Sequence, residues 1–125
     1  MATIFELQNP PFGQLTKTKV IKTENGAHTL TTAEIIEGIV DGTPTGNRAI
    51  TTPTAAEIIS ALGTQSGVGQ CFDLTIVNKA ASTHKFTLTA GSGVTIVGEP
   101  DITADSSGTF IFRVSSSTAV SAFRK

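Results

Sequence analysis

The fold is decided by the stretch Phe72-Asp73-Leu74-Thr75-Ile76-Val77, just past the middle of the chain. Its large apolar residues alternate with polar or smaller ones, a period of two that is typical of a half-buried β-strand. Strand-like segments of this kind follow at residues 85–89, 94–96, 110–115 and 120–123. Turn formers such as Asp105-Ser106-Ser107-Gly108 separate them. Short strands at this spacing predict a mainly β fold, a small antiparallel β-sandwich or barrel that is jelly-roll-like.

Two short helices are predicted upstream of these strands. Thr31-Thr32-Ala33-Glu34 and Thr54-Ala55-Ala56-Glu57 both match the capping box, in which the Thr and Glu side chains each bond a free amide at a helix start. We therefore expect helices near residues 32–40 and 54–62. The phrase Ala-Glu-Ile-Ile recurs in them at an offset of 23 residues. Two copies are fewer than the three or so units that a repeat architecture normally stacks.

An extended N-terminal arm is expected over residues 1–30, before a β-rich domain at 31–125. The run Asn9-Pro10-Pro11-Phe12-Gly13 is turn and polyproline chemistry that interrupts any helix. The apolar residues of the arm are too scattered to build a core. Such a segment typically docks on its own domain, on a neighbouring subunit or on another protein.

The composition excludes several classes of protein. Charged residues make up 15% of the 125 residues and the net charge is −1, so no basic field for nucleic acid exists. The chain has no apolar stretch long enough to span a membrane and no basic, apolar leader of a secretory signal. One cysteine cannot form an intramolecular disulfide. A sparsely charged surface indicates that a partner covers much of it. The outward residues Cys71, Val77 and Ile111 would suit a subunit interface. We predict a homo-oligomer, with a cyclic trimer first.

No constellation for catalysis, a cofactor or a metal is expected. His28 and His84 lie far apart in sequence without the spacing of a zinc site. The carboxylates near residues 99–105 lack the EF-hand pattern. Cys71 has no local signature of a nucleophile, and no Gly-x-Ser-x-Gly elbow occurs. We predict that the protein is not an enzyme, and a Cys71→Ala change that abolished an activity would contradict this.

Residues 42–125 resemble a β-rich module of structural proteins in tailed bacteriophages and large algal viruses. The blocks that carry the resemblance, in order, are Gly42–Arg48, Thr52–Ile59, Val68–Asn78, Thr89–Gly98, Ser107–Arg113 and Ala119–Ser121. The resemblance implies a virion component without catalytic activity. Because no shaft or repeat precedes the module in this sequence, we expect a capsid decoration (cement) protein, made in the host cytoplasm, that trimerises over the major capsid protein on the head surface.

In this interpretation the arm holds the capsid shell or adds a strand to a neighbouring sheet. The expected capsid contacts are Phe5, Leu7, Pro10, Pro11, Phe12, Lys17, Lys19 and Lys22. The alternative is a fibre or spike knob, an adhesin that binds a host receptor through the loops Gly91–Gly93, Glu99–Asp105 and Ser115–Thr118. A third possibility is a small oligomeric β domain of another role.

Overall fold

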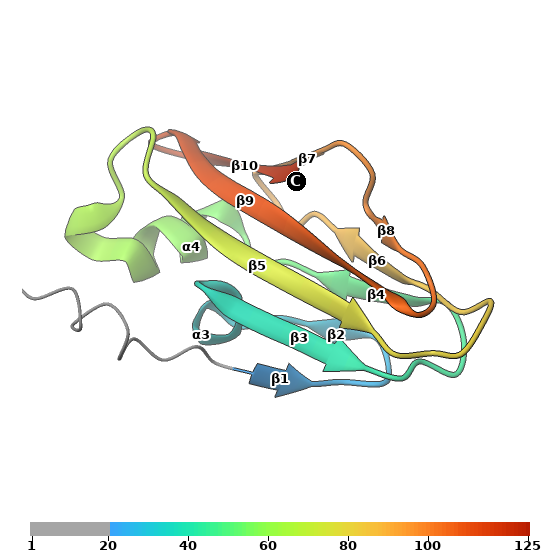
Figure 1. The fold of residues 1–125 in the computed structure, drawn as a ribbon. Coiled ribbons are helices and arrows are strands. Elements are labelled where there is room, and N and C mark those ends of the chain that lie inside the picture. The colour runs from blue at the N-terminus through green and yellow to red at the C-terminus, as the bar shows by residue number, and fades with distance from the viewer. Residues whose placement is uncertain (1–20) are drawn as a thin grey trace, which may run out of the picture.

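The strand predicted around Phe72 lies inside the larger of two β-sheets in the computed structural model (Figure 1). The structure describes residues 21–125. Its elements in chain order are β1 (Ile21–Thr23), β2 (His28–Thr29), α3 (Thr32–Ile35), β3 (Gly38–Gly42), β4 (Arg48–Thr51), α4 (Ala55–Leu62), the 3-10 helix η1 (Gly63–Gln65), β5 (Cys71–Asn78), β6 (Phe86–Thr89), β7 (Val94–Val97), β8 (Asp101–Ile102), β9 (Ser106–Ser116) and β10 (Ala119–Arg124). All five strand segments predicted for the C-terminal half are therefore present.

Two layers face each other across one core. The large sheet has the strand order β1-β3-β5-β9-β10-β7, and the small sheet has the order β2-β4-β6-β8. Figure 1 shows the large sheet in front of the small one, with both helices at one end. This confirms a mainly β fold and a small β-sandwich.

The first six strands form successive turns of a flattened coil. Each turn sends one strand to the large sheet and the next to the small sheet, in the pairs β1 and β2, β3 and β4, and β5 and β6. Consequently β1, β3 and β5 run parallel to one another, and so do β2, β4 and β6. The helices α3 and α4 return the chain from the small sheet to the large one after the first and second turns.

The expectation that the sheets are antiparallel holds only for the later strands. Antiparallel pairs join β5 to β9, β9 to β10, and β6 to β8, whereas β10 and β7 are parallel. Both sheets are therefore mixed. Alternation along one strand shows which side is buried, but it does not show the direction of the neighbouring strand.

The capping boxes form as the sequence predicts. Thr31 and Thr54 accept the backbone N–H of Glu34 and Glu57, and the two glutamates bond back to the N-cap amides. Helix α4 spans nearly the whole predicted segment, but α3 ends at Ile35 instead of continuing to residue 40, because Gly38 already begins β3. The two helices contact each other at equivalent places in successive turns of the coil.

The domain begins earlier than predicted. Residues 21–23 and 28–29 form β1 and β2 and pair with β3 and β4, so the boundary of the arm at residue 30 is wrong. These edge strands have only three and two residues and lack a dense apolar pattern, so the sequence did not indicate them. The remaining part of the arm, residues 1–20, lies outside the described residues.

Large side chains fill the space between the sheets. Phe86, Phe110 and Phe112 are fully buried, and Phe72 stacks on Phe112 across β5 and β9 with ring centroids 5.0 Å apart. Two polar side chains, Thr52 and Asn78, are also buried. Asn78 lies at the end of β5 and bonds the backbone around β6 and β8. The core joins both sheets into one body.

Candidate interaction surface

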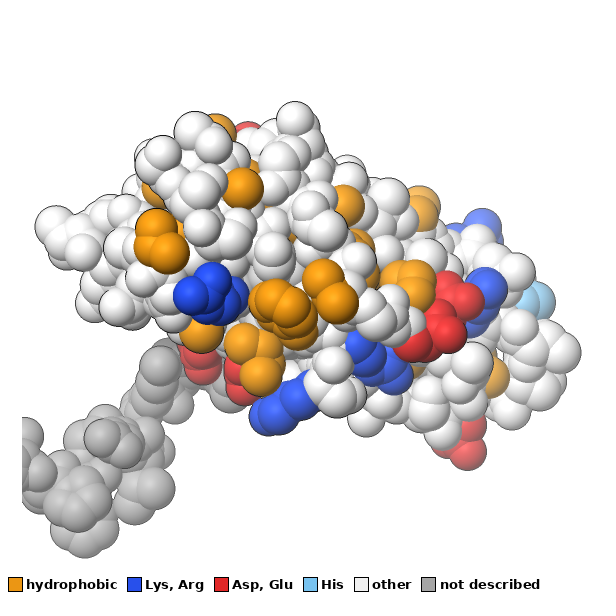
Figure 2. Space-filling model, turned by 90° about the horizontal axis from the view of Figure 1, so that it is seen from above, with side chains coloured by type: hydrophobic (Ala, Val, Ile, Leu, Met, Phe, Trp, Pro, Cys, Tyr) orange, Lys and Arg blue, Asp and Glu red, His pale blue; other side chains and the backbone are white. Residues whose placement is uncertain are grey.

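The outer face of the large sheet carries an open row of apolar side chains. Strand register aligns Asp73 on β5 with Ile111 on β9, Phe123 on β10 and Val97 on β7. Val97 is 45% exposed and Phe123 39%, and Ile111 is partly exposed. Figure 2 shows hydrophobic side chains gathered in the open on the upper side of the molecule, where Figure 1 places β9, β10 and β7. We call the row of Ile111, Phe123 and Val97, together with Asp73, Arg113 and Cys71 beside it, the outer-face patch.

The three residues predicted for a subunit interface all lie on this face. Cys71 and Val77 are the outward residues near the two ends of β5, and Ile111 lies in the apolar row. The Cys71 thiol is exposed and lies 3.2 Å from the carbonyl oxygen of Gly69. The structure therefore brings the predicted residues onto one surface, while their burial by another subunit stays a prediction.

Sequence reasoning missed the most exposed members of the face. Phe123 and Val97 point outward, and on the β1 edge Ile21 is 63% exposed beside the half-buried Ile39. The signal for Phe123 was present, because Val120 and Ala122 alternate with it along β10 and are buried. The register between strands, which aligns Phe123 with Ile111, has no counterpart in the sequence pattern.

Opposite charges border the apolar row. Asp73 ends the row on β5, and Arg113 lies one pleat away on β9, opposite Cys71. Within residues 21–125 neither side chain has a hydrogen bond or ion pair, although the backbone N–H of Asp73 donates to the Glu37 carboxylate at 3.2 Å. These two charges are thus free on the face.

Another carboxylate on the same face is already paired. Asp41 on β3 accepts from the Lys79 ammonium at 3.1 Å and from the Thr23 hydroxyl at 3.0 Å. The bond from Lys79, opposed by a smaller effect of burial and assisted by Thr23, holds the pKa of Asp41 below its ordinary value. This corner of the face is satisfied within the chain, in contrast to Asp73 and Arg113.

Lys22 is the one expected capsid-contact residue that the structure describes. Its ammonium lies 3.8 Å from Glu24 and 3.9 Å from Glu34. His28 lies between the same two carboxylates, with Nε2 at 3.0 Å from Glu34. Burial raises the pKa of Glu34, but the Thr31 N–H, His28 and Lys22 together outweigh it and leave that pKa lowered. This cluster ties β1 and β2 to the start of α3. The other arm residues, Phe5, Leu7, Pro10, Pro11, Phe12, Lys17 and Lys19, lie outside the described residues.

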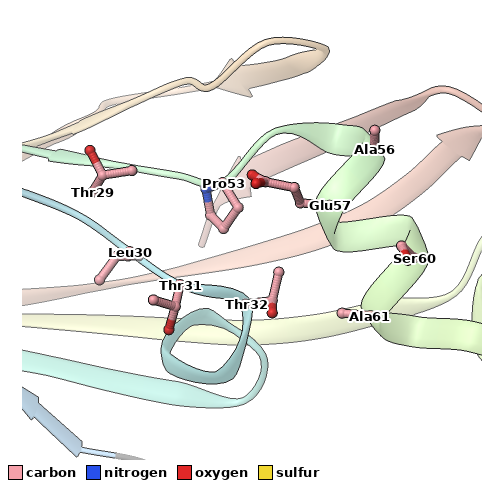
Figure 3. A pocket seen from close by; sticks show the side chains of 9 residues that line it. All are labelled: Thr29, Leu30, Thr31, Thr32, Pro53, Ala56, Glu57, Ser60 and Ala61. Carbon is pink, nitrogen blue, oxygen red and sulfur yellow. The ribbon is translucent and has the colours of Figure 1, made fainter.

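An open groove of about 670 Å³ lies between the chain before α3 and the exposed side of α4 (Figure 3). It is lined by Thr29, Leu30, Thr31, Thr32, Pro53, Ala56, Glu57, Ser60 and Ala61. Among these nine residues Glu57 alone is charged, and its carboxylate accepts the backbone N–H of Thr54 at 2.9 Å. The groove offers small hydroxyl and methyl groups and one carboxylate that already caps a helix.

The loops considered for receptor binding do not share one end of the sandwich. Gly91–Gly93 and Ser115–Thr118 are neighbours, because the Val120 N–H donates to the Gly93 carbonyl and a Cβ on Gly93 would meet the Thr118 carbonyl at 3.2 Å. Glu99–Asp105 lies at the opposite end of β7, where the Arg124 guanidinium donates to the carbonyl oxygens of residues 99 and 101. Two of the three loops thus form a common surface.

Within residues 21–125 no three His, Cys, Asp or Glu side chains gather in a way that would hold a metal ion. Asp101, one of the carboxylates near residues 99–105, already accepts hydrogen bonds from Lys85 at 2.6 Å and from the Thr87 hydroxyl at 2.7 Å. In the same part of the chain, no helix is long and apolar enough to cross a membrane.

The fold defines a small β-sandwich with mixed sheets and an open apolar outer face. Comparisons of the chain with protein-family models, with curated proteins and with solved structures gave no match.

Proposed function

We propose that this chain is a non-enzymatic structural protein of a virion, a decoration protein that trimerises on the capsid surface and stabilises the lattice of the major capsid protein. The observation that carries the proposal is the outer-face patch: Ile111, Phe123 and Val97 lie in one open row on a chain with few charges. Apolar side chains gathered on one sheet face mark a contact surface. The resemblance of residues 42–125 to a module of virion proteins indicates that the assembly is a virion.

In this mechanism the β-rich domain forms the trimer and the N-terminal arm binds the capsid. Three copies bury the outer face of the large sheet around an axis, and residues 1–20 bind the capsid shell. Three weak arm contacts then act together, since the first one bound raises the effective concentration of the others. The trimer thereby clamps neighbouring capsid subunits.

The first test is the copy number of this chain relative to the major coat protein in particles purified from its source. Near parity, at hundreds of copies, supports decoration because only a lattice offers so many equivalent sites. About a dozen copies would support a vertex spike or fibre, and absence from the particle would overturn both. Copies are counted by quantitative mass spectrometry with isotope-labelled peptides.

A second test removes residues 1–20. Every residue of the described core lies between Leu30 and Ala122, so we expect the truncated chain to fold and to keep the oligomeric state of the full chain. We also expect it to lose binding to empty shells, as measured by co-sedimentation. Binding by the truncated chain at full-length affinity would refute the role of the arm.

The second candidate function is an adhesin knob that binds a host receptor. One observation favours it, the neighbouring positions of Gly91–Gly93 and Ser115–Thr118 at one end of the sandwich. It predicts that the domain from residue 21 onward binds host cells or a glycan array by itself. A decoration protein is expected to bind neither.

A further inference from the structure

We propose that copies of this chain associate through the outer-face patch with Asp73 of one copy paired to Arg113 of the next. This inference rests on the trimer of the proposed function and assigns its contact. It concerns only the association of copies, so it is tested without capsid shells.

The register places the two charges at one end of the apolar row. Asp73 is opposite Ile111, and Arg113 is opposite Cys71, so Asp73 and Arg113 are diagonal neighbours on β5 and β9. Diagonal neighbours on one face are about 7–8 Å apart, within reach of a long side chain. Yet they form no ion pair with each other or with any residue from 21 to 125. The neighbouring Asp41, by contrast, is paired with Lys79 at 3.1 Å.

The combination of charges identifies the occupant of the patch as a second copy. A patch that carries only one sign needs a partner of the opposite sign, whereas this one holds a free carboxylate and a free guanidinium beside apolar surface. Around a threefold axis the carboxylate of each copy can meet the guanidinium of the next, so identical copies complement one another. Ile111 and Phe123 would form the apolar centre and the charges its rim, which is the usual arrangement of interfaces.

Charge reversal tests the pairing. Asp73→Arg and Arg113→Asp each place like charges at the contact, and we expect each to weaken association at least about tenfold. The double variant Asp73→Arg/Arg113→Asp restores opposite charges between identical copies, so it should associate as the wild-type chain does. Glu99→Arg changes the net charge as Asp73→Arg does, but at an exposed site beyond β7, and should leave association unchanged.

The oligomeric state is measured by sedimentation velocity over a concentration series, with circular dichroism to verify that each variant is folded. A mixture of the two single variants distinguishes the symmetries. In a ring of three, chains with two positive or two negative sites cannot alternate, so no closed trimer forms. A stable one-to-one complex would support the Asp73–Arg113 contact but contradict a trimer in favour of a twofold dimer.

Three results would overturn the inference: a wild-type chain that stays monomeric at high concentration, single variants that associate as the wild type does, or a folded double variant that does not associate. A chain that oligomerises as expected but is absent from particles would refute the proposed function and leave this contact intact.

Discussion

The buried Asn78 allows the sharpest test of what holds the two sheets together. Its amide nitrogen donates to the carbonyl oxygens of His84 and Ile102, both at 2.9 Å, and its oxygen accepts the N–H of Ala80 at 2.9 Å. The side chain thus joins the end of β5 in the large sheet to the segments before β6 and at β8. Asn78→Ala removes all three bonds and leaves their partners without a replacement in the core.

The expected loss follows from the number of bonds. At about 1 kcal/mol net for each hydrogen bond, Asn78→Ala should lower the free energy of unfolding by about 3 kcal/mol. This is a large share of the roughly 5–15 kcal/mol that stabilises a typical domain. With an unfolding entropy of about 2.1 cal/mol/K per residue, this corresponds to a melting temperature lower by about 11–14 °C.

Two further variants separate hydrogen bonding from packing. Asn78→Asp keeps the size of the side chain but replaces two donors by a carboxylate that faces two carbonyl oxygens, so it should destabilise more than Asn78→Ala at pH 7. Asn47→Ala removes one exposed bond, to the Lys85 N–H at 3.1 Å, and should cost less than about 1 kcal/mol.

Urea unfolding followed by far-ultraviolet circular dichroism is the suitable assay, because the chain contains neither Trp nor Tyr. All variants are compared at one protein concentration, since association would add to the apparent stability. A loss below about 1 kcal/mol for Asn78→Ala, or one equal to that of Asn47→Ala, would refute the role assigned to this side chain.

Three other predictions test local features of the fold. Thr54→Ala removes the N-cap of α4 and should lower the free energy of unfolding by about 1 kcal/mol; the exposed Ser60→Ala on the same helix should not lower it, and equal losses would contradict the capping assignment. A Cβ on Gly91 would lie 2.5 Å from a backbone carbonyl oxygen just before α4, so Gly91→Ala should cost about 1–3 kcal/mol in thermal or urea unfolding, and wild-type stability would show that the contact yields freely. The hydrogen bond from Lys85 holds the pKa of Asp101 below its ordinary value of 3.8. This pair therefore stabilises the fold above that pH and ceases to do so as the pH falls through the lowered pKa. Urea midpoints measured from pH 7 to pH 2 should fall less for Asp101→Asn than for the wild type, and identical profiles would contradict the assignment.

The sequence predicts local structure in this chain much better than the pairing of its strands. Alternation at Phe72, Leu74 and Ile76 correctly indicates the buried side of β5, and both capping boxes form at the predicted threonines. Each of these signals depends on residues close together along the chain. Pairing depends on contacts between distant segments, and the parallel neighbours of β5 and β6 leave no mark in the pattern of either strand.

The candidate site shows the same division. Cys71, Val77 and Ile111 were assigned to an outward face because each alternates with buried residues, and the structure places them there. The row that joins Ile111 to Phe123 and Val97 exists only through the register of β9, β10 and β7. Likewise, the proximity of Asp73 to Arg113 across 40 positions of sequence follows from pairing alone.

The recurring Ala-Glu-Ile-Ile phrase has a structural meaning that two copies alone could not establish. In each turn of the coil the chain leaves the small sheet, forms a capped helix and enters the large sheet, and the 23-residue offset is the distance between these equivalent helices. The third turn has Gly91-Ser92-Gly93 in place of a helix, and Gly91 passes against the chain just before α4, where a helix with side chains would not fit.

Beyond this turn, β9 pairs with β5 and β8 pairs with β6, which closes that end of the coil. At the other end, no strand among residues 21–125 covers the outer edges of β1 and β2. Residue 20 directly precedes β1, which is one of these edge strands. The deletion of residues 1–20 therefore also tests whether this segment stabilises the edge that the described strands leave uncovered.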